Sequence, residues 1–503
     1  MNLITTVYKQ ETIFKYIRRV GTLILFAILT FIFLIESPLH PWVGRDSYTD
    51  SSVFQCIGMM MHRGYMPYRD SFDPKGPVLY LLNYWGQSIS SIRGVWVIEY
   101  IFMLVNFTFI YKIARLVTGR IQAILTLLTA TALLGEYFTG GNLTEEYAMP
   151  MISISMYIFL DYFYNKKVSF LRLILCGVTF SIVLLLRPNM VSLWVVCCIA
   201  ISLQCLCQSN GKEFSFFTFS FLLGAALVLI PILIWLIWNS SFTAFWADYI
   251  QFNLVYSQNT LANKIQVFFS FLQEPLLCIS IILTVYFCKV DASHRRLWIT
   301  YLCCFLLSTF TASMAAIDQG HYCMVLVPIT AFPFAYLGKY CILSKKESFS
   351  VFAVLALLYS TLVVPTWAEF CSLTASNYNG RNSTNYSQTL RTIGSIVKEY
   401  TSANDTISVY GNWDMVYVYC ERPHATKYSY QTAISRLAPD LFTDYWKEMQ
   451  EEQPKVIVVE ANHLDYYIEQ FTTENHYSLV WVQSEENPKA GACVYVKSSE
   501  DII

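Results

Sequence analysis

The chain has 503 residues, of which 55% are hydrophobic and only 14% are charged, and its formal net charge is -1. A soluble domain averages about 25% charged residues, so this composition excludes a chain that lies wholly in water. The near-neutral charge, with basic residues placed between apolar runs, gives no indication of a nucleic-acid partner. Most of the fifteen cysteines lie inside apolar runs, where Cys behaves as a small hydrophobe.

Taken in chain order, the apolar runs predict about eleven membrane-spanning helices, because a span needs about 20 apolar residues and at least roughly 17. These runs cover residues 20–36, 97–117, 120–138, 147–164, 170–187, 189–207, 215–238, 268–288, 297–316, 322–342 and 350–368. The first run follows four basic residues and lacks an A-x-A cleavage site, so we expect it to remain as a membrane anchor.

Lysine and arginine gather in every second loop between these runs. By the positive-inside rule this alternation predicts a cytoplasmic N-terminus, and an odd number of spans then places everything after Phe370 outside the cytoplasm. The absence of a clear eukaryotic mark favours the plasma (inner) membrane of a bacterium. Counting residues 77–92 as a further span would invert every later loop. We therefore interpret them as an amphipathic helix at the outer interface, with Tyr80, Tyr84 and Trp85 at headgroup depth.

The C-terminal part changes in character and predicts a small α/β domain. From Asn377 onward the sequence is polar, and short β-type runs follow at 406–410, 456–459, 479–482 and 493–496. Helical patterns occupy about 388–400 and 440–452. The prediction is thus a polytopic α-helical membrane module over residues 1–370 and an extracytoplasmic α/β domain over 371–503.

The long segment 37–96 is the most informative part of the chain. It mixes acidic residues, among them Asp46 and Asp50, with basic residues, among them Arg69 and Lys75. Charged groups at a bilayer surface are costly unless a solvated site uses them. The simpler interpretation is a charged loop in which Asp50 caps the helix that follows, and capping does not exclude catalysis.

Further polar residues occur at positions that the predicted topology places on the same face. Glu145 lies in the loop before a span, where it can help to bind a cation, take a proton, or simply serve the positive end of the next helix. Arg187 ends one span, and His321 and Tyr322 precede another. Together with Lys75, the Arg and His side chains suit an anionic phosphate group, although Arg187 alone can also extend to the interface.

These motifs resemble those of bacterial GT-C glycosyltransferases, which are related to protein O-mannosyltransferases and to the lipid A aminoarabinose transferase. The resemblance rests on four segments in the family's order: the first loop from Asp50-Ser51 through Gly64-Tyr65 to Asp73-Pro74-Lys75-Gly76-Pro77, then Thr144-Glu145, Leu186-Arg187-Pro188 and His321-Tyr322. It covers most of the chain, including the soluble tail.

The resemblance implies transfer of a sugar from a polyprenyl-phosphate-linked donor to a glycan, lipid or protein acceptor on the outer face of the membrane. Asp50 would take the family's first acidic position, with Asp46 as its rival, and Glu145 the second, where relatives often carry Asp. Lys75, Arg69, Arg187, His321 and Tyr322 would face the donor phosphate. A divalent cation, Mg²⁺ or Mn²⁺, on Asp50 and Glu145 stays open, because some family members need one and others do not. The chemistry expected is a single displacement with inversion.

Two other classes of function remain as alternatives. About eleven spans also suit a transporter or lipid flippase, but the spans are nearly free of the carboxylates expected along a transport path, and no clear internal repeat is present. An envelope glycan polymerase or ligase is another enzyme of the outer face. Neither class explains the first-loop pattern together with a soluble C-terminal domain.

Overall fold

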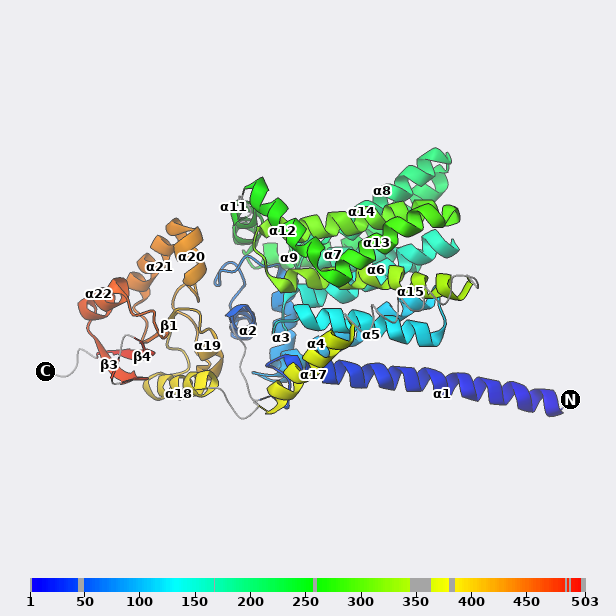
Figure 1. Ribbon diagram of the computed structural model, residues 1–503. Helices are drawn as coiled ribbons and strands as arrows, with labels where there is room; N and C mark the ends of the chain where they lie inside the picture. The colour runs from blue at the N-terminus through cyan, green and yellow to red at the C-terminus, as the bar shows by residue number, and fades with distance from the viewer. Residues whose placement is uncertain are drawn as a thin grey trace.

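The computed structural model describes residues 2–43, 49–166, 168–256, 260–343, 363–379, 385–484, 486–487 and 490–498. Figure 1 shows two parts: a bundle of long helices, and a smaller domain of helices and short strands at one end of it, with helices α2 and α3 between them. The start of α1 and the strand β4, near the two ends of the described chain, lie at opposite ends of the molecule. Below, the bundle end next to the smaller domain is called the domain end, and the opposite end is called the far end.

The bundle is built from helices that follow the predicted apolar runs. They are α1 (Asn2–Phe33), α4 (Gly94–Arg115), α5 (Arg120–Tyr137), α6 (Thr144–Asn165), α7 (Phe170–Leu184), α8 (Ser192–Cys207), α9 (Gly211–Trp238), α12 (Leu261–Gln273), α13 (Pro275–Val290), α14 (Arg295–Ala312) and α15 (Val327–Leu343). The short helices α10 (Phe242–Phe245), η3 (Trp246–Gln251) and α11 (Phe252–Tyr256) follow α9 at the domain end.

Within the described residues, five helices are long and apolar enough to cross a membrane, or six if one bent pair counts as a single span. The prediction of about eleven spans is therefore not confirmed. The predicted run 268–288 is wrong as a single helix, because α12 and α13 meet at a bend of 85°. Pro275 begins α13, and a proline there has no N–H to continue the preceding helix. Most of the predicted run 350–368 lies outside the described residues.

Close helix packing holds the bundle together where glycines face each other. Gly177 on α7 and Gly224 on α9 lie so close to the opposite backbone that an added Cβ would stand 2.0 Å from a carbonyl oxygen of the partner helix in each case. Small residues permit this approach in membrane helices. The outward face of α9 exposes large apolar side chains such as Phe219, Leu222 and Trp238. The chain is therefore a membrane protein by its apolar surface as well as by its composition.

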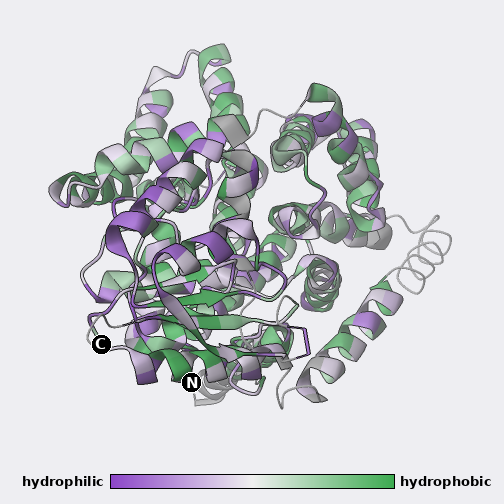
Figure 2. Ribbon diagram, turned by 90° about the vertical axis from the view of Figure 1, so that its left-hand side faces the viewer, coloured by the Kyte–Doolittle hydropathy of each residue, from purple (hydrophilic) through white to green (hydrophobic). Residues whose placement is uncertain are grey.

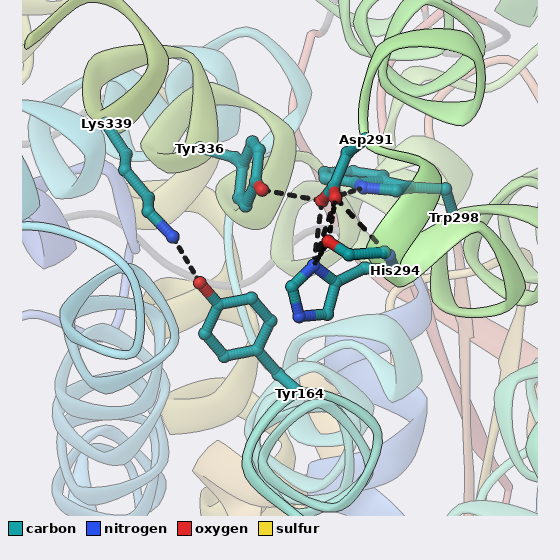
Figure 3. Close-up of polar contacts among 7 residues, drawn as sticks. Tyr164, Asp291, His294, Trp298, Tyr336 and Lys339 are labelled. Atoms are coloured by element: carbon teal, nitrogen blue, oxygen red, sulfur yellow. Dashed lines mark hydrogen bonds and ion pairs between the residues drawn. The ribbon is translucent and has the colours of Figure 1, made fainter. Parts of the chain in front are cut away.

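A polar cluster ties four helix ends together at the far end of the bundle (Figure 3). The carboxylate of Asp291, between α13 and α14, accepts hydrogen bonds from Tyr336 of α15 at 2.6 Å and from Trp298 of α14 at 3.2 Å. His294 lies 3.0 Å from the same carboxylate and stacks on Tyr164 of α6. Since these residues come from α6, α14, α15 and the α13–α14 turn, the cluster fixes the far ends of the helices relative to one another.

The C-terminal domain contains a mixed four-stranded sheet in the order β1-β2-β4-β3. The strands are β1 (Ile407–Tyr410), β2 (Val456–Val459), β3 (Tyr477–Val482) and β4 (Cys493–Lys497). β1 and β2 are parallel, with Ile407 opposite Val456, whereas β4 is antiparallel to both of its neighbours. β1 and β2 are buried along their whole length, and Figure 2 shows the strands as hydrophobic elements among more hydrophilic helices.

All four predicted β runs form strands, and both predicted helices form as α18 (Asn385–Tyr400) and α21 (Pro439–Glu452). Three short helices were not predicted: α19 (Met415–Cys420), α20 (Thr432–Leu437) and α22 (Tyr466–Glu474). The helix α17 (Val364–Asn379) crosses the predicted domain boundary at residue 370.

The segment 77–92 contains the helix α3 (Pro77–Ile89), which packs between α2 (Thr49–His62) and α4. The expectation that Tyr80 lies at headgroup depth is wrong, because its side chain is fully buried and donates a 2.6 Å hydrogen bond to Asp73. Trp85, by contrast, is 54% exposed. A tyrosine with a buried carboxylate partner gains more from that hydrogen bond than from an interfacial position.

Candidate active site

The candidate site lies at the domain end of the bundle, where the first loop meets α6 and the segment that follows α7. Gly76 allows this meeting. Its amide donates to the carbonyl of Leu186 at 3.1 Å, and an added Cβ would lie 1.9 Å from the carbonyl oxygen of Leu185. Only glycine fits such an approach. The Lys75-Gly76-Pro77 motif therefore places Lys75 beside Arg187.

The first loop is fixed from inside by Asp73. One carboxylate oxygen of Asp73 accepts from the Tyr80 hydroxyl at 2.6 Å and from the Lys75 amide at 3.0 Å. The other accepts from the hydroxyl of Tyr430, in the C-terminal domain, at 3.2 Å. Burial raises the pKa of Asp73, and the nearby charge of Lys75 opposes that shift. Asp73 thus ties the first loop, α3 and the C-terminal domain to one point.

Lys75 is the central cation of the site. Burial tends to lower its pKa, but the carboxylates of Asp50 and Asp73 outweigh burial, so the net shift of the pKa is upward. Asp50 lies in the first turn of α2 and is exposed. It is within the helix rather than ahead of it, so the capping interpretation does not describe its position. Lys75 also lies within electrostatic range of Arg187 and Tyr322.

Glu145, Arg187 and Tyr322 form a second group, held by direct contacts. The guanidinium of Arg187 lies 2.5 Å from the Glu145 carboxylate, and both side chains are largely buried. The other oxygen of Glu145 accepts a 2.8 Å hydrogen bond from Thr144. The Arg187 guanidinium also stacks over the Tyr322 ring, 4.4 Å from its centre. His321 is half-buried and lies within electrostatic range of Glu145 and Asp50.

A buried polar network supports the segment that leads into α6, whose first turn carries Glu145. The amide group of Asn142 donates to Ser51 at 3.0 Å and to Asn83 at 2.9 Å, and its oxygen accepts from Tyr147 at 2.8 Å. Its backbone amide donates to Glu146 at 2.7 Å. Because Ser51 follows Asp50, Asn142 links the first turns of α2 and α6, which carry the two predicted acidic residues. The sequence analysis gave Asn142 no role, although it stands two residues before the Thr144-Glu145 motif.

The structure gathers most, but not all, of the predicted site residues. Asp50, Lys75, Glu145, Arg187, His321 and Tyr322 lie in one cluster. Arg69 instead pairs with its neighbour Asp70 at 2.7 Å and donates to the carbonyl of Asn239. Asp46 lies outside the described residues. The described residues also contain no group of three or more His, Cys, Asp or Glu side chains placed to hold a metal ion.

A narrow pocket opens from this cluster between α6, α8 and α14. Its polar end is lined by Glu145, Arg187, Asn189 and Tyr322, and its other walls include Ile152, Leu193 and Ala312. A second, apolar pocket continues along the same three helices towards the far end, with lining residues that include Phe159, Cys197 and Tyr301. The two pockets are lined by the same three helices, the first beside the Glu145–Arg187 ion pair and the second among apolar side chains.

The fold matches solved structures along almost its whole length. ArnT from Cupriavidus metallidurans bound to undecaprenyl phosphate aligns with a TM-score of 0.61 at 13% identity, covering 95% of this chain and 98% of that chain. ArnT in the apo state aligns with a TM-score of 0.57 at 11% identity, covering 96% and 98%. The archaeal oligosaccharyltransferase AglB from Archaeoglobus fulgidus, in complex with an inhibitory peptide and a dolichol-phosphate, gives 0.51 at 14% identity, covering 97% and 75%.

These likenesses, with the helical bundle and the first-loop cluster, define the chain as a membrane protein of the GT-C fold. The family model described as putative competence-induced protein Ccs4 N-terminal domain matches residues 9–363, and the chain belongs to that family. No curated protein matches the chain.

Proposed function

We propose that the protein is a glycosyltransferase that moves a sugar from a polyprenyl-phosphate-linked donor to an acceptor on the extracytoplasmic face of the plasma membrane. The observation that carries this proposal is the placement of Lys75 and Arg187 within electrostatic range of each other and of Asp50, with Arg187 also at the polar end of a small pocket between α6, α8 and α14. A cationic group beside apolar helices suits a ligand with a phosphate at the end of a long isoprenoid chain.

The donor phosphate would bind Lys75 and Arg187. Arg187 offers a planar set of donors that matches phosphate oxygens, and the Glu145 carboxylate, 2.5 Å away, holds that group in place. We therefore assign Glu145 to the positioning of Arg187. Its carboxylate is buried and its charge is already paired with the Arg187 guanidinium, so a metal ion there would have to compete with that cation. Asp50 alone of the two predicted metal ligands is exposed, and we derive no step through Mg²⁺ or Mn²⁺.

The reaction would proceed by one displacement. The acceptor hydroxyl oxygen attacks the anomeric carbon and forms the new glycosidic bond, while Asp50 takes the hydroxyl proton. The bond between that carbon and the phosphate oxygen breaks, and the lipid phosphate leaves with the electron pair. Lys75 and Arg187 stabilise the negative charge that grows on the leaving phosphate. Attack opposite to the leaving group inverts the anomeric configuration.

The first experiment measures sugar transfer by the purified protein in lipid, with a panel of labelled polyprenyl-phosphate sugars. Asp50→Asn removes the proton acceptor and should abolish transfer, whereas the matched control Asp440→Asn, an exposed acid in the first turn of α21, should leave it unchanged. Transfer by Asp50→Asn at the normal rate would remove Asp50 from the mechanism. No transfer from any donor would favour a transporter, or an envelope glycan polymerase or ligase.

A second experiment tests the channel for the isoprenoid chain. Thr300 lines the apolar pocket on α14, while its neighbour Ile299 is 50% exposed on the outer face of the same helix. Thr300→Trp should raise the KM for a long-chain donor much more than for a short-chain donor, and Ile299→Trp should change neither. An equal effect of Thr300→Trp on both donors would place the isoprenoid chain elsewhere.

A further inference from the structure

The C-terminal domain contains a cavity of about 360 Å³ at one edge of its sheet, and the mechanism above does not use it. The parallel strands β1 and β2 end at this edge. Tyr410 is the last residue of β1 and Gly411 follows it, and Asn462 and His463 follow the end of β2. The carboxyl ends of adjacent parallel strands are the usual position of ligand sites in α/β sheets. The remaining walls come from α20, α21 and α22, which surround this edge in Figure 1.

Aromatic rings form one side of the cavity. Tyr410, Phe442 and Tyr467 all line it, and Tyr467 keeps 57% of its surface exposed. The rings of Phe442 and Tyr467 meet edge to face, with centres 6.2 Å apart. An exposed tyrosine held by neighbouring rings contributes little to a buried core, but it offers a flat apolar face to a ligand.

Polar groups converge from the other side. The carboxylate of Asp465 is fixed by the Tyr410 hydroxyl at 2.7 Å and by the amide of Ile468 at 3.1 Å, and each of its oxygens keeps a further lone pair. The side chain of Asn462 makes no hydrogen bond within the described part of the chain. Gln431 is fixed by Gly411 at 2.8 Å. The site thus combines preorganised acceptors with a free amide.

The charge of the lining selects among ligands. Asp465 is its acidic member, and no Lys or Arg belongs to the lining among the described residues. An anionic ligand would meet the Asp465 carboxylate, and the one lining histidine, His463, lies 3.9 Å from a second carboxylate, that of Glu460, so binding of an anion is unfavourable. A neutral polyol can place hydroxyl groups on the carboxylate and amides and can rest its C–H face on the tyrosine ring. We infer that this cavity binds a neutral saccharide.

The cavity is connected to the candidate active site through one short segment. Tyr430 donates to Asp73 of the first loop, and the next residue, Gln431, lines the cavity. If the protein is the proposed glycosyltransferase, the bound saccharide would be part of the acceptor glycan, held beside the active site. This role of the cavity rests on the proposed function. Saccharide binding itself does not depend on catalysis.

The test measures saccharide binding to the full-length protein in lipid nanodiscs by saturation-transfer NMR. The panel contains neutral oligosaccharides, uronic acid oligosaccharides and a peptide. Neutral saccharides should bind, and Tyr467→Ala should weaken that binding about tenfold, as expected for the loss of one aromatic contact. The matched control is Tyr466→Ala, because Tyr466 is 71% exposed and lies outside the lining.

Two further variants keep the result interpretable. Asn462→Gly removes the free amide at a position with φ of 64°, which glycine adopts without strain, and should also weaken binding. Asp50→Asn should bind saccharide normally, so a failure of catalysis remains distinct from a failure of the cavity. Binding that survives both Tyr467→Ala and Asn462→Gly would overturn the inference. Equal binding of uronic acids, or binding of the peptide alone, would overturn it as well.

Discussion

Asp414 makes the stability of the C-terminal domain depend on pH. It lies fully buried at the start of α19, and burial is the main cause that raises its pKa from 3.8 to about 7, with smaller upward contributions from the nearby carboxylates of Asp73 and Glu460. The folded state therefore holds a proton on Asp414 between about pH 4 and pH 7, whereas the unfolded state does not. Stability is highest in acid and falls as the pH rises through this window.

The size of the effect follows from the two pKa values. Each pH unit inside the window changes the free energy of unfolding by about 1.4 kcal/mol, so the full difference of about three units amounts to roughly 4 kcal/mol. Between pH 5 and pH 8 the expected change is roughly 3 kcal/mol, or on the order of 100-fold in the equilibrium for opening of this region. Asp414→Asn replaces the titratable carboxyl group by an amide, and so removes this contribution to the pH dependence of stability.

The opening of α19 can be followed at Cys420, which is buried in that helix. The assay is labelling of Cys420 with a thiol reagent, measured by peptide mass spectrometry on the full-length protein. The rate for the wild type relative to Asp414→Asn should rise roughly 100-fold from pH 5 to pH 8, and this ratio cancels the intrinsic pH dependence of the thiol. The control Asp440→Asn should follow the wild type. A ratio that stays constant with pH would refute the reasoning.

Three further predictions concern individual side-chain contacts. Lys427→Met leaves the buried carboxylate of Asp248 without its cationic partner at 2.7 Å, and should destabilise the packing of the C-terminal domain by about 3–5 kcal/mol at pH 8. The loss should be smaller at pH 5, because the pKa of Asp248 is about 6 and its carboxylate is then largely protonated. Limited proteolysis at pH 8 that is unchanged by the substitution would contradict this. Asn142→Ala leaves several buried polar partners without a hydrogen bond, at a cost of about 1–3 kcal/mol each. The melting temperature of the protein in detergent should therefore fall by several degrees. An unchanged melting temperature would show that the network does not stabilise the protein. Arg187→Lys keeps the charge beside Glu145 but loses the planar guanidinium donors, so the rate of sugar transfer should fall at least about tenfold while the protein stays folded. A wild-type rate of transfer would argue against phosphate binding at Arg187.

Much of the fold could be predicted because it depends on local patterns. The apolar runs predicted nearly every described bundle helix, and short runs rich in β-branched and aromatic residues predicted all four strands. The failures have local causes too. The run 268–288 was treated as one helix because hydropathy averages over Pro275, and α19, α20 and α22 were missed because six to nine residues carry too little periodicity.

The sequence by itself determined the class of the chain and the residue types of the candidate site. The motifs containing Asp50, Lys75, Glu145 and Arg187 stand out in the sequence, since charged residues at the ends of apolar runs are costly without a use. Their mutual contacts could not be read from it, because the ion pair between Glu145 and Arg187 joins residues 42 positions apart.

Only the tertiary structure decided which charges meet. It paired Arg69 with Asp70, buried Tyr80 against Asp73, and brought Tyr430 from the C-terminal domain to the first loop. The physical reason is that a hydrogen bond or an ion pair needs its two groups within about 3–4 Å, and such distances between remote segments depend on how the helices pack.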